Sequence, residues 1–91
     1  MGYRTGVAVT VDAVGAPENI PAPSPCRRVR VQQLQTETLV DYLVYESNST
    51  SNPKRRVAGS EHIFENLDGN LYQQSEVVGR VATVSGTGTF E

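Results

Sequence analysis

The sequence predicts a small all-β protein, either an antiparallel β-sandwich or a jelly-roll-like barrel of six to eight short strands. Valine is the most frequent residue, with 13 of 91, and eight threonines add further β-branched side chains. Short segments of alternating apolar and polar residues recur along the chain with turn signals between them. No segment shows a long 3.6-residue period with helix caps. We therefore expect one β domain over residues 1–91.

The N-terminal quarter combines a strand with a proline-rich connection. Apolar and polar residues alternate within residues 3–14, which predicts a strand with one more apolar face. Residues 15–25 hold four of the five prolines. Because proline lacks an N–H, this segment cannot join a sheet centrally. We expect an extended arm that lies over the domain or reaches a neighbour, and the alternative is a surface linker. The prolines are Pro17, Pro21, Pro23 and Pro25.

Two strands are predicted in the middle of the chain. Residues 26–34 place Val29 and Val31 on one face, with Arg28 and Arg30 on the other. Residues 39–45 are apolar on both faces apart from one aspartate, which is typical of a central strand. A helix competes there because seven residues do not settle the period, but tyrosines and β-branched residues favour a strand.

The next part of the chain contains a loop, a short strand and a turn. Residues 46–56 are polar and include Asn52–Pro53, which predicts a loop. Residues 61–65 predict a short strand in which Ile63 opposes its neighbours across the pleat. An Asp-Gly pair within residues 66–70 is typical of a hairpin turn.

The C-terminal part predicts the longest late strand at residues 76–84. Within it, Gly79 indicates a bulge or a close approach of backbone. Residues 85–88 are rich in glycine and predict a turn, after which Thr89 and Phe90 end the pattern.

Composition excludes several classes of site. One cysteine and one histidine exclude an internal disulfide framework and a Cys/His zinc site, and we expect no cofactor. The formal net charge is −2, so a global basic field for nucleic acid is absent. No apolar run approaches the length of a membrane span. No apolar core of a secretory signal follows residues 1–4.

Catalytic residues are sparse. Cys26 lies beside arginines that would lower a thiol pKa, so Cys26 and His62 could form a nucleophilic pair. The favoured alternative is a small, half-buried cysteine at a strand start and a histidine on the surface. Four carboxylates could supply an acid and a base, but the chain is small for a sugar cleft, and solvated charges are favoured. They are Glu61, Glu65, Asp68 and Glu76. The run 68–70 resembles part of a calcium loop without its remaining ligands. We predict no catalytic and no metal-binding residue.

Two basic clusters in this acidic chain are candidate interface residues. Arginine suits bidentate pairing with carboxylates across an interface, and the acids gather in residues 61–76. This segregation favours contact with an identical subunit or an acidic partner, and the alternative is a solvated surface. The candidates are Arg27, Arg28, Arg30, Lys54, Arg55 and Arg56, together with Pro21 and Pro23 of the arm.

Three stretches carry a resemblance to small bacteriophage virion proteins. Residues 23–29 (PSPCRRV) are similar to the start of the first core strand of such proteins. Residues 56–61 (RVAGSE) are similar to the approach to a middle strand, and residues 66–72 (NLDGNLY) to the segment after it. Together they lie within residues 23–72, about half the chain.

The resemblance implies a non-enzymatic capsid decoration or cement protein with a β-sandwich fold. Proteins of this kind sit on the capsid surface, often as trimers, and brace the shell through subunit contacts. It implies the major capsid protein or another virion protein as partner, with synthesis in the host cytoplasm. It brings no catalytic residue. The alternative is a receptor- or carbohydrate-binding module of a phage fibre or tail, with Tyr42, Tyr45 and Tyr72 as stacking groups.

Overall fold

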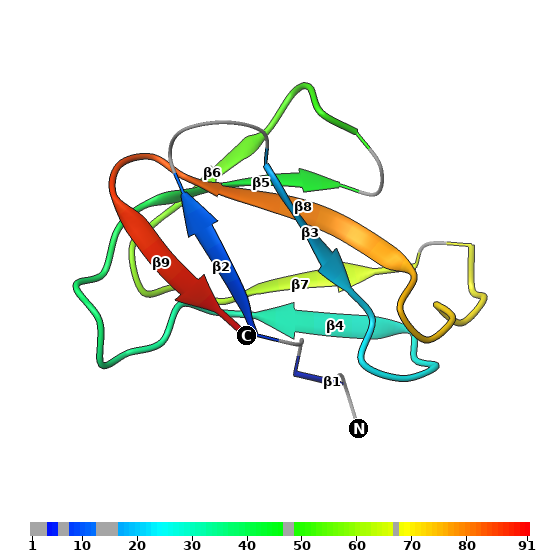
Figure 1. The fold of residues 1–91 in the computed structure, drawn as a ribbon. Helices are drawn as coiled ribbons and strands as arrows, with labels where there is room; N and C mark the ends of the chain where they lie inside the picture. The colour runs from blue at the N-terminus through cyan, green and yellow to red at the C-terminus, as the bar shows by residue number, and fades with distance from the viewer. Residues whose placement is uncertain (1–3, 6–7, 13–16, 47–48, 67) are drawn as a thin grey trace.

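The structure, a computed structural model, describes all residues except 1–3, 6–7, 13–16, 47–48 and 67. The described residues form nine strands and no helix (Figure 1). The strands are β1 (Arg4–Thr5), β2 (Val9–Asp12), β3 (Glu18–Pro21), β4 (Arg28–Val31), β5 (Tyr42–Glu46), β6 (Lys54–Arg56), β7 (His62–Glu65), β8 (Val77–Thr83) and β9 (Thr87–Phe90). The all-β prediction is confirmed, with one more described strand than the upper limit of eight.

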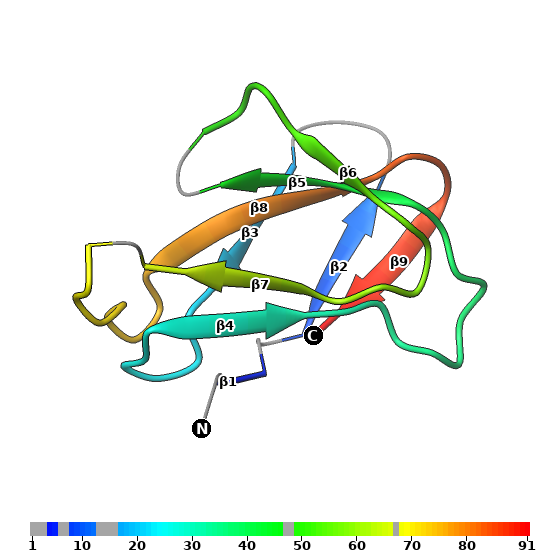
Figure 2. The ribbon, with the colours of Figure 1, turned by 180° about the vertical axis from the view of Figure 1, so that it is seen from behind.

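The strands form two layers that face each other (Figures 1 and 2). One layer is the four-stranded sheet β3-β8-β5-β6. The other contains the sheet β1-β4-β7 and the pair β2-β9, which a bridge between Gln33 and Phe90 joins to the end of β4. All pairings between these strands are antiparallel except β1 with β4. The arrangement agrees with the predicted small antiparallel sandwich.

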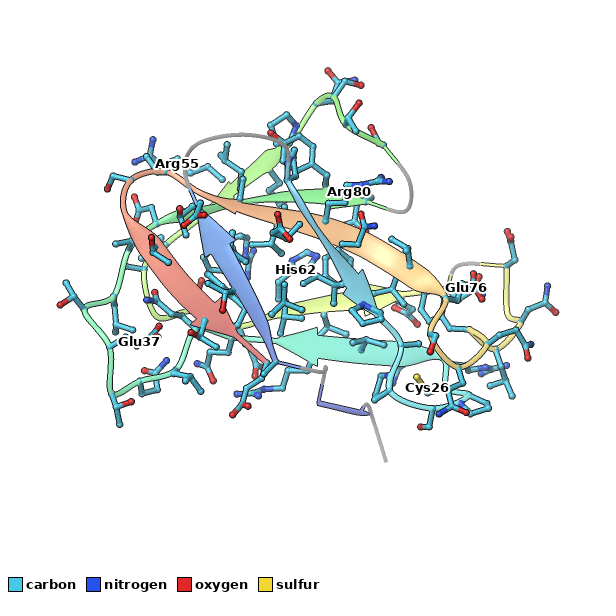
Figure 3. The ribbon with its side chains drawn as sticks, viewed as in Figure 1. Cys26, Glu37, Arg55, His62, Glu76 and Arg80 are labelled. Atoms are coloured by element: carbon cyan, nitrogen blue, oxygen red, sulfur yellow. The ribbon has the colours of Figure 1, made fainter. Side chains whose placement is uncertain are left out.

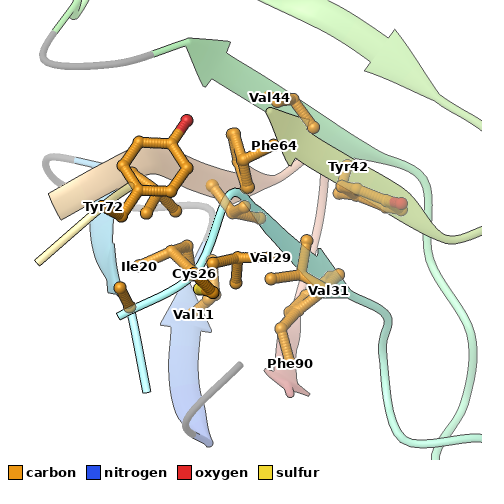
Figure 4. Packing of buried hydrophobic residues seen from close by; sticks show 13 residues of the cluster. Val11, Ile20, Cys26, Val29, Val31, Tyr42, Val44, Phe64, Tyr72 and Phe90 are labelled. Atoms are coloured by element: carbon orange, nitrogen blue, oxygen red, sulfur yellow. The ribbon is translucent and has the colours of Figure 1, made fainter. Parts of the chain in front are cut away.

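The core lies between the layers and draws on both of them (Figure 4). Alternate residues point inward in several strands, as at Val29 and Val31 of β4 and at Tyr42 and Val44 of β5. The rings of Tyr42 and Phe90 pack edge to face with centroids 4.9 Å apart, and so connect β5 to β9. One cluster of buried apolar side chains thus joins strands of all three sheets.

A β-bulge in β8 confirms the prediction for Gly79. Ile20 pairs with Gly79 but Pro21 pairs with Val77, so one residue of β8 has no partner on β3. A Cβ atom on Gly79 would overlap the ring of Phe64 and lie 2.7 Å from the carbonyl oxygen of Tyr45. Only glycine lets β8 pass this close to the ring.

The prediction of a loop over residues 46–56 is wrong at its end. Lys54–Arg56 form β6, which pairs with β5 at the edge of the four-stranded sheet. Charged residues have low strand propensity, but they are common on edge strands because they hinder pairing with other chains. The pairing also gives β5 a partner on both sides, which confirms that it is central. β5 begins at Tyr42, later than predicted.

The proline-rich segment is held by its own chain. Residues 18–21 form β3, an edge strand that pairs with β8, so proline is kept from the centre of the sheet as predicted. The N–H of Ala22 donates to the carbonyl oxygen of Glu76 at 2.8 Å, which extends the pairing. From residue 18 the segment pairs with β8 of its own chain, and the pairing reaches as far as Pro21. Residues 15 and 16 lie outside the described residues.

The Asp-Gly turn forms without the expected hairpin. Gly69 has a φ of 79°, the left-handed conformation that the turn requires. The strand before the turn, β7, pairs with β4, and Tyr72 after it pairs with Cys26. The turn thus leads the chain past the beginning of β4 and on to β8.

Candidate functional site

A row of ion pairs covers the outer face of β4 and β7. Arg28 Nε lies 3.2 Å from Glu65 Oε2, and Arg30 Nε lies 2.5 Å from Glu61 Oε2. Ile63 stands between the two glutamates, opposite Arg30, and is 36% exposed. Ion pairs with exposed partners contribute only about 0–1 kcal/mol each. Their main effect here is to arrange alternating charges around one exposed apolar side chain.

Two residues of the second basic cluster, Arg55 and Arg56, are also bonded within the chain. Arg55 donates to Asp41 Oδ2 at 2.9 Å, and Arg56 donates to the carbonyl oxygen of Glu61 at 2.8 Å. Arg27 of the first cluster donates to the carbonyl oxygen of Gly69 at 3.2 Å. Of the acids within residues 61–76, Glu61 and Glu65 pair with arginines of their own chain. The charge segregation read from the sequence does not by itself define an interface.

Asp41 organises the corner between β5 and β6. The guanidinium of Arg55 and the N–H of Ala58 both bond its carboxylate, and these bonds lower the pKa of Asp41. Its own C=O accepts from the N–H of Val84 at 3.0 Å. Asp41 thus holds the segment around Arg55 and Ala58 through its carboxylate and Val84 through its backbone C=O.

Cys26 and His62, the candidate nucleophile and base, do not meet. His62 pairs with Val31 of β4, whereas Cys26 lies five residues before Val31, which corresponds to about 17 Å along a strand. Figure 3 shows the two side chains in different parts of the sandwich. Both are buried, and Cys26 belongs to the apolar cluster. Cys26 lies just before β4, as predicted, and is more deeply buried than expected. The prediction of a surface histidine is wrong, because the side chain of His62 lies between the two layers.

His62 connects the two layers instead. Its Nε2 lies 3.0 Å from Glu46 Oε2 at the end of β5, and its ring packs edge to face on Phe64. Burial lowers the pKa of His62, with smaller contributions from Arg56 and Lys54, while Glu46 acts in the opposite direction. The imidazole is accordingly neutral at neutral pH. The Nε of Arg56 close by is buried without a hydrogen-bond partner among the described residues.

Two of the three tyrosines proposed for stacking on a ligand are buried. Tyr42 is fully buried and donates its hydroxyl to the carbonyl oxygen of Ser60 at 2.7 Å. Tyr72 is 8% exposed, and burial raises its pKa. Tyr45 is half-buried. These residues do not form an open aromatic platform, so the stacking interpretation is wrong for Tyr42 and Tyr72.

A polar network around Gln33 was missed in the sequence. Gln33 is 1% exposed, donates to Glu37 Oε1 and to the carbonyl oxygen of Thr38, and accepts from the N–H of Val40. Glu37 also accepts from the N–H of Thr89, and this bond is the main reason that its pKa is lowered. The network shapes the loop between β4 and β5. No sequence pattern marks it, because a lone glutamine in a strand is usually exposed.

A shallow depression of about 200 Å³ lies over the junction of β4 and β9 and is lined by polar residues and Leu34. Small-molecule pockets usually enclose roughly 300–1,000 Å³ with mostly apolar walls. No group of three or more metal-ligating side chains occurs among the described residues.

The outer edge of β7 is open. The N–H of Asn66 donates to the carbonyl oxygen of Arg27 at 3.0 Å, so these two residues form a hydrogen-bonded pair. Along β4 and β7, such pairs alternate with pairs that share no backbone hydrogen bond. His62 and Phe64 direct their backbone groups toward β4, so Ile63 and Glu65 direct theirs away from the sheet. Within the described part of the chain, nothing bonds the N–H and C=O groups of these two residues. This edge is the candidate functional site.

Comparisons with protein-family models, with curated proteins and with solved structures find no match to this chain. None of the residues that the structure describes forms a helix that could cross a membrane.

Proposed function

We propose that this chain is a non-enzymatic structural subunit that attaches to other protein chains through the open edge of β7. Following the resemblance described above, the assembly is a bacteriophage virion. The chain acts there as a capsid decoration or cement subunit, with the major capsid protein or another virion protein as partner. It is made in the host cytoplasm and functions on the capsid surface.

This proposal rests on the backbone N–H and C=O groups of Ile63 and Glu65 in β7, which no described residue bonds. An open edge binds an extended segment of another chain through main-chain hydrogen bonds, with affinity independent of a deep pocket. A domain of this size buries a modest core, and contacts with neighbours add stability by mass action. The outer face of β4 and β7 lies beside this edge and offers Ile63 among paired charges, the mixture common in protein interfaces.

The proposal is tested by following the chain during virus assembly. A tagged copy of the chain is expressed in host cells that are producing the virus particles. The cell lysates are then separated on density gradients. We expect the chain to sediment with the particles. A chain that stays at the top of the gradient while particles form normally would contradict the proposed function.

A pair of variants ties the result to the edge of β7. Ile63→Pro removes an N–H that β4 does not use, whereas Ile63→Val keeps it. We expect the proline variant to fold but to leave the particle fraction, and the valine variant to remain there. Circular dichroism and thermal melting check that both variants are folded.

A further inference from the structure

The edges of the two layers differ in how they are protected. β6 consists of three consecutive basic residues and follows Pro53. β3 ends at Pro21, beside a bulge. Prolines, charges and bulges are the usual devices that prevent pairing of edge strands. β7 contains neither proline nor lysine, and its outward residues are Ile63 and Glu65. Of these three edges, β7 is the one built to accept a strand.

We propose that the partner of β7 is β7 of a second copy, paired antiparallel about a two-fold axis at Phe64. This inference rests on the proposed assembly function: the edge of β7 joins two copies of the subunit, and the pair then binds the other virion protein through its remaining surface. In this arrangement Ile63 of each copy faces Glu65 of the other. Their N–H and C=O groups form four reciprocal hydrogen bonds.

Charge selects this register among the three closest two-fold arrangements. An axis at Ile63 would place Glu61 against Glu65 of the second copy, and an axis at Glu65 would place the two Glu65 side chains together. Like charges directly opposite each other destabilise antiparallel pairs. The axis at Phe64 sets Glu65 of each copy against Ile63 of the other, and it leaves the ion pair between Glu65 and Arg28 intact.

The neighbouring side chains support a second copy in this register. Ile63 packs against the hydrocarbon part of Glu65 from the second copy, which covers part of the exposed surface of Ile63. The two-fold axis repeats this contact for Ile63 of the second copy. Phe64 faces Phe64 on the inner side, where each ring is already buried in its own core. The sheet then continues through both molecules as β4-β7-β7-β4.

Two variants at one position test the contact by charge. Ile63→Glu sets a glutamate against Glu65 of the second copy, and Ile63→Lys sets a lysine there. The nearest residue on β4 of the same chain is Arg30, which tolerates the glutamate, so the monomer keeps its fold. Circular dichroism and thermal melting check both variants.

Sedimentation equilibrium gives the outcome. We expect the wild-type protein to be a dimer that dissociates between about 1 µM and 1 mM, the range typical of small interfaces. The dimer of Ile63→Glu should be weaker than that of Ile63→Lys by about tenfold or more, because each variant changes two equivalent pairs. A monomer throughout this range, or equal dissociation constants for both variants, would overturn the proposal.

Cysteine crosslinking tests the register itself. In the double variant Ile63→Cys/Glu65→Cys, the thiol at position 63 of one copy faces the thiol at position 65 of the other copy. The two lie within the reach of a disulfide. Oxidation should give a covalent dimer. The single variant Ile63→Cys is the matched control, because its two new thiols are offset by two residues and should remain uncoupled. Native Cys26 is present in both proteins. Efficient crosslinking of the single variant would contradict the register.

The two proposals fail in different ways. A protein that joins particles but remains monomeric in solution would overturn the self-pairing and leave the proposed function standing. A dimer with the predicted charge dependence that never enters particles would do the reverse.

Discussion

Single residues determine how closely the two layers approach. Gly79 lets β8 pass over the ring of Phe64, and His62 reaches across from β7 to Glu46 on β5. The first contact depends on the absence of a side chain, and the second on a neutral imidazole within the sandwich. Each can be tested with one substitution.

The variant Gly79→Ala should be strongly destabilised. Its Cβ would overlap Phe64 and crowd the carbonyl oxygen of Tyr45, so the layers must separate, at a cost of about 1–3 kcal/mol or more. Urea unfolding measures the loss. Gly86→Ala is the control, since Gly86 has a positive φ but open space around it, and only about 1 kcal/mol of backbone strain is expected. Equal losses would contradict the packing argument.

His62 should make stability depend on pH near neutrality. Burial lowers the pKa of His62 in the folded protein below its ordinary value of about 6.5. The unfolded chain therefore binds a proton first, and stability falls as the pH drops through that value. Unfolding at pH 7.5 and 5.5, above the range of the carboxylates, should show a smaller loss for His62→Gln than for wild type. If the wild type and His62→Gln lose the same stability between pH 7.5 and pH 5.5, His62 is not the group responsible for the pH dependence.

Pairing with a neighbouring strand decides where some strands form, and a sequence pattern does not reveal that pairing. The alternation of valines predicted β2 and β4, and the apolar run predicted a central β5. The pattern failed at β6, because Lys54–Arg56 form a strand only through pairing with β5. It also missed β3, where a short stretch among prolines pairs with β8. Tertiary pairing overrides weak local propensity at both positions.

The network at Gln33 provides a test at the scale of one element. The variant Gln33→Leu would leave the N–H of Val40 unbonded and remove a donor from Glu37. We expect a loss of about 1–3 kcal/mol in the free energy of unfolding. Gln35→Ala removes an exposed side chain of the same type and should cost less than about 1 kcal/mol. If the two variants unfold at the same urea concentration, the network has no special role.

At the scale of the whole molecule, the sequence predicted the fold class but not the candidate site. The antiparallel all-β arrangement followed from alternation and turn signals, although the structure has one described strand more than the predicted upper limit of eight. The basic clusters stay candidate interface residues, and three of their arginines, Arg28, Arg30 and Arg55, also pair within the chain. The open edge of β7 depends on which strand lies beside which, information that a single sequence does not contain. Its only local sign is an isoleucine between glutamates.

Protection of backbone amides against hydrogen exchange tests the central claim most directly. The amide of Phe64 bonds within the β4–β7 ladder and should be protected at every protein concentration. The amides of Ile63 and Glu65 should exchange rapidly in dilute protein and become protected as the protein concentration rises or particles are added. If both amides exchange at the same rapid rate under all these conditions, the edge of β7 binds no strand and the account is wrong.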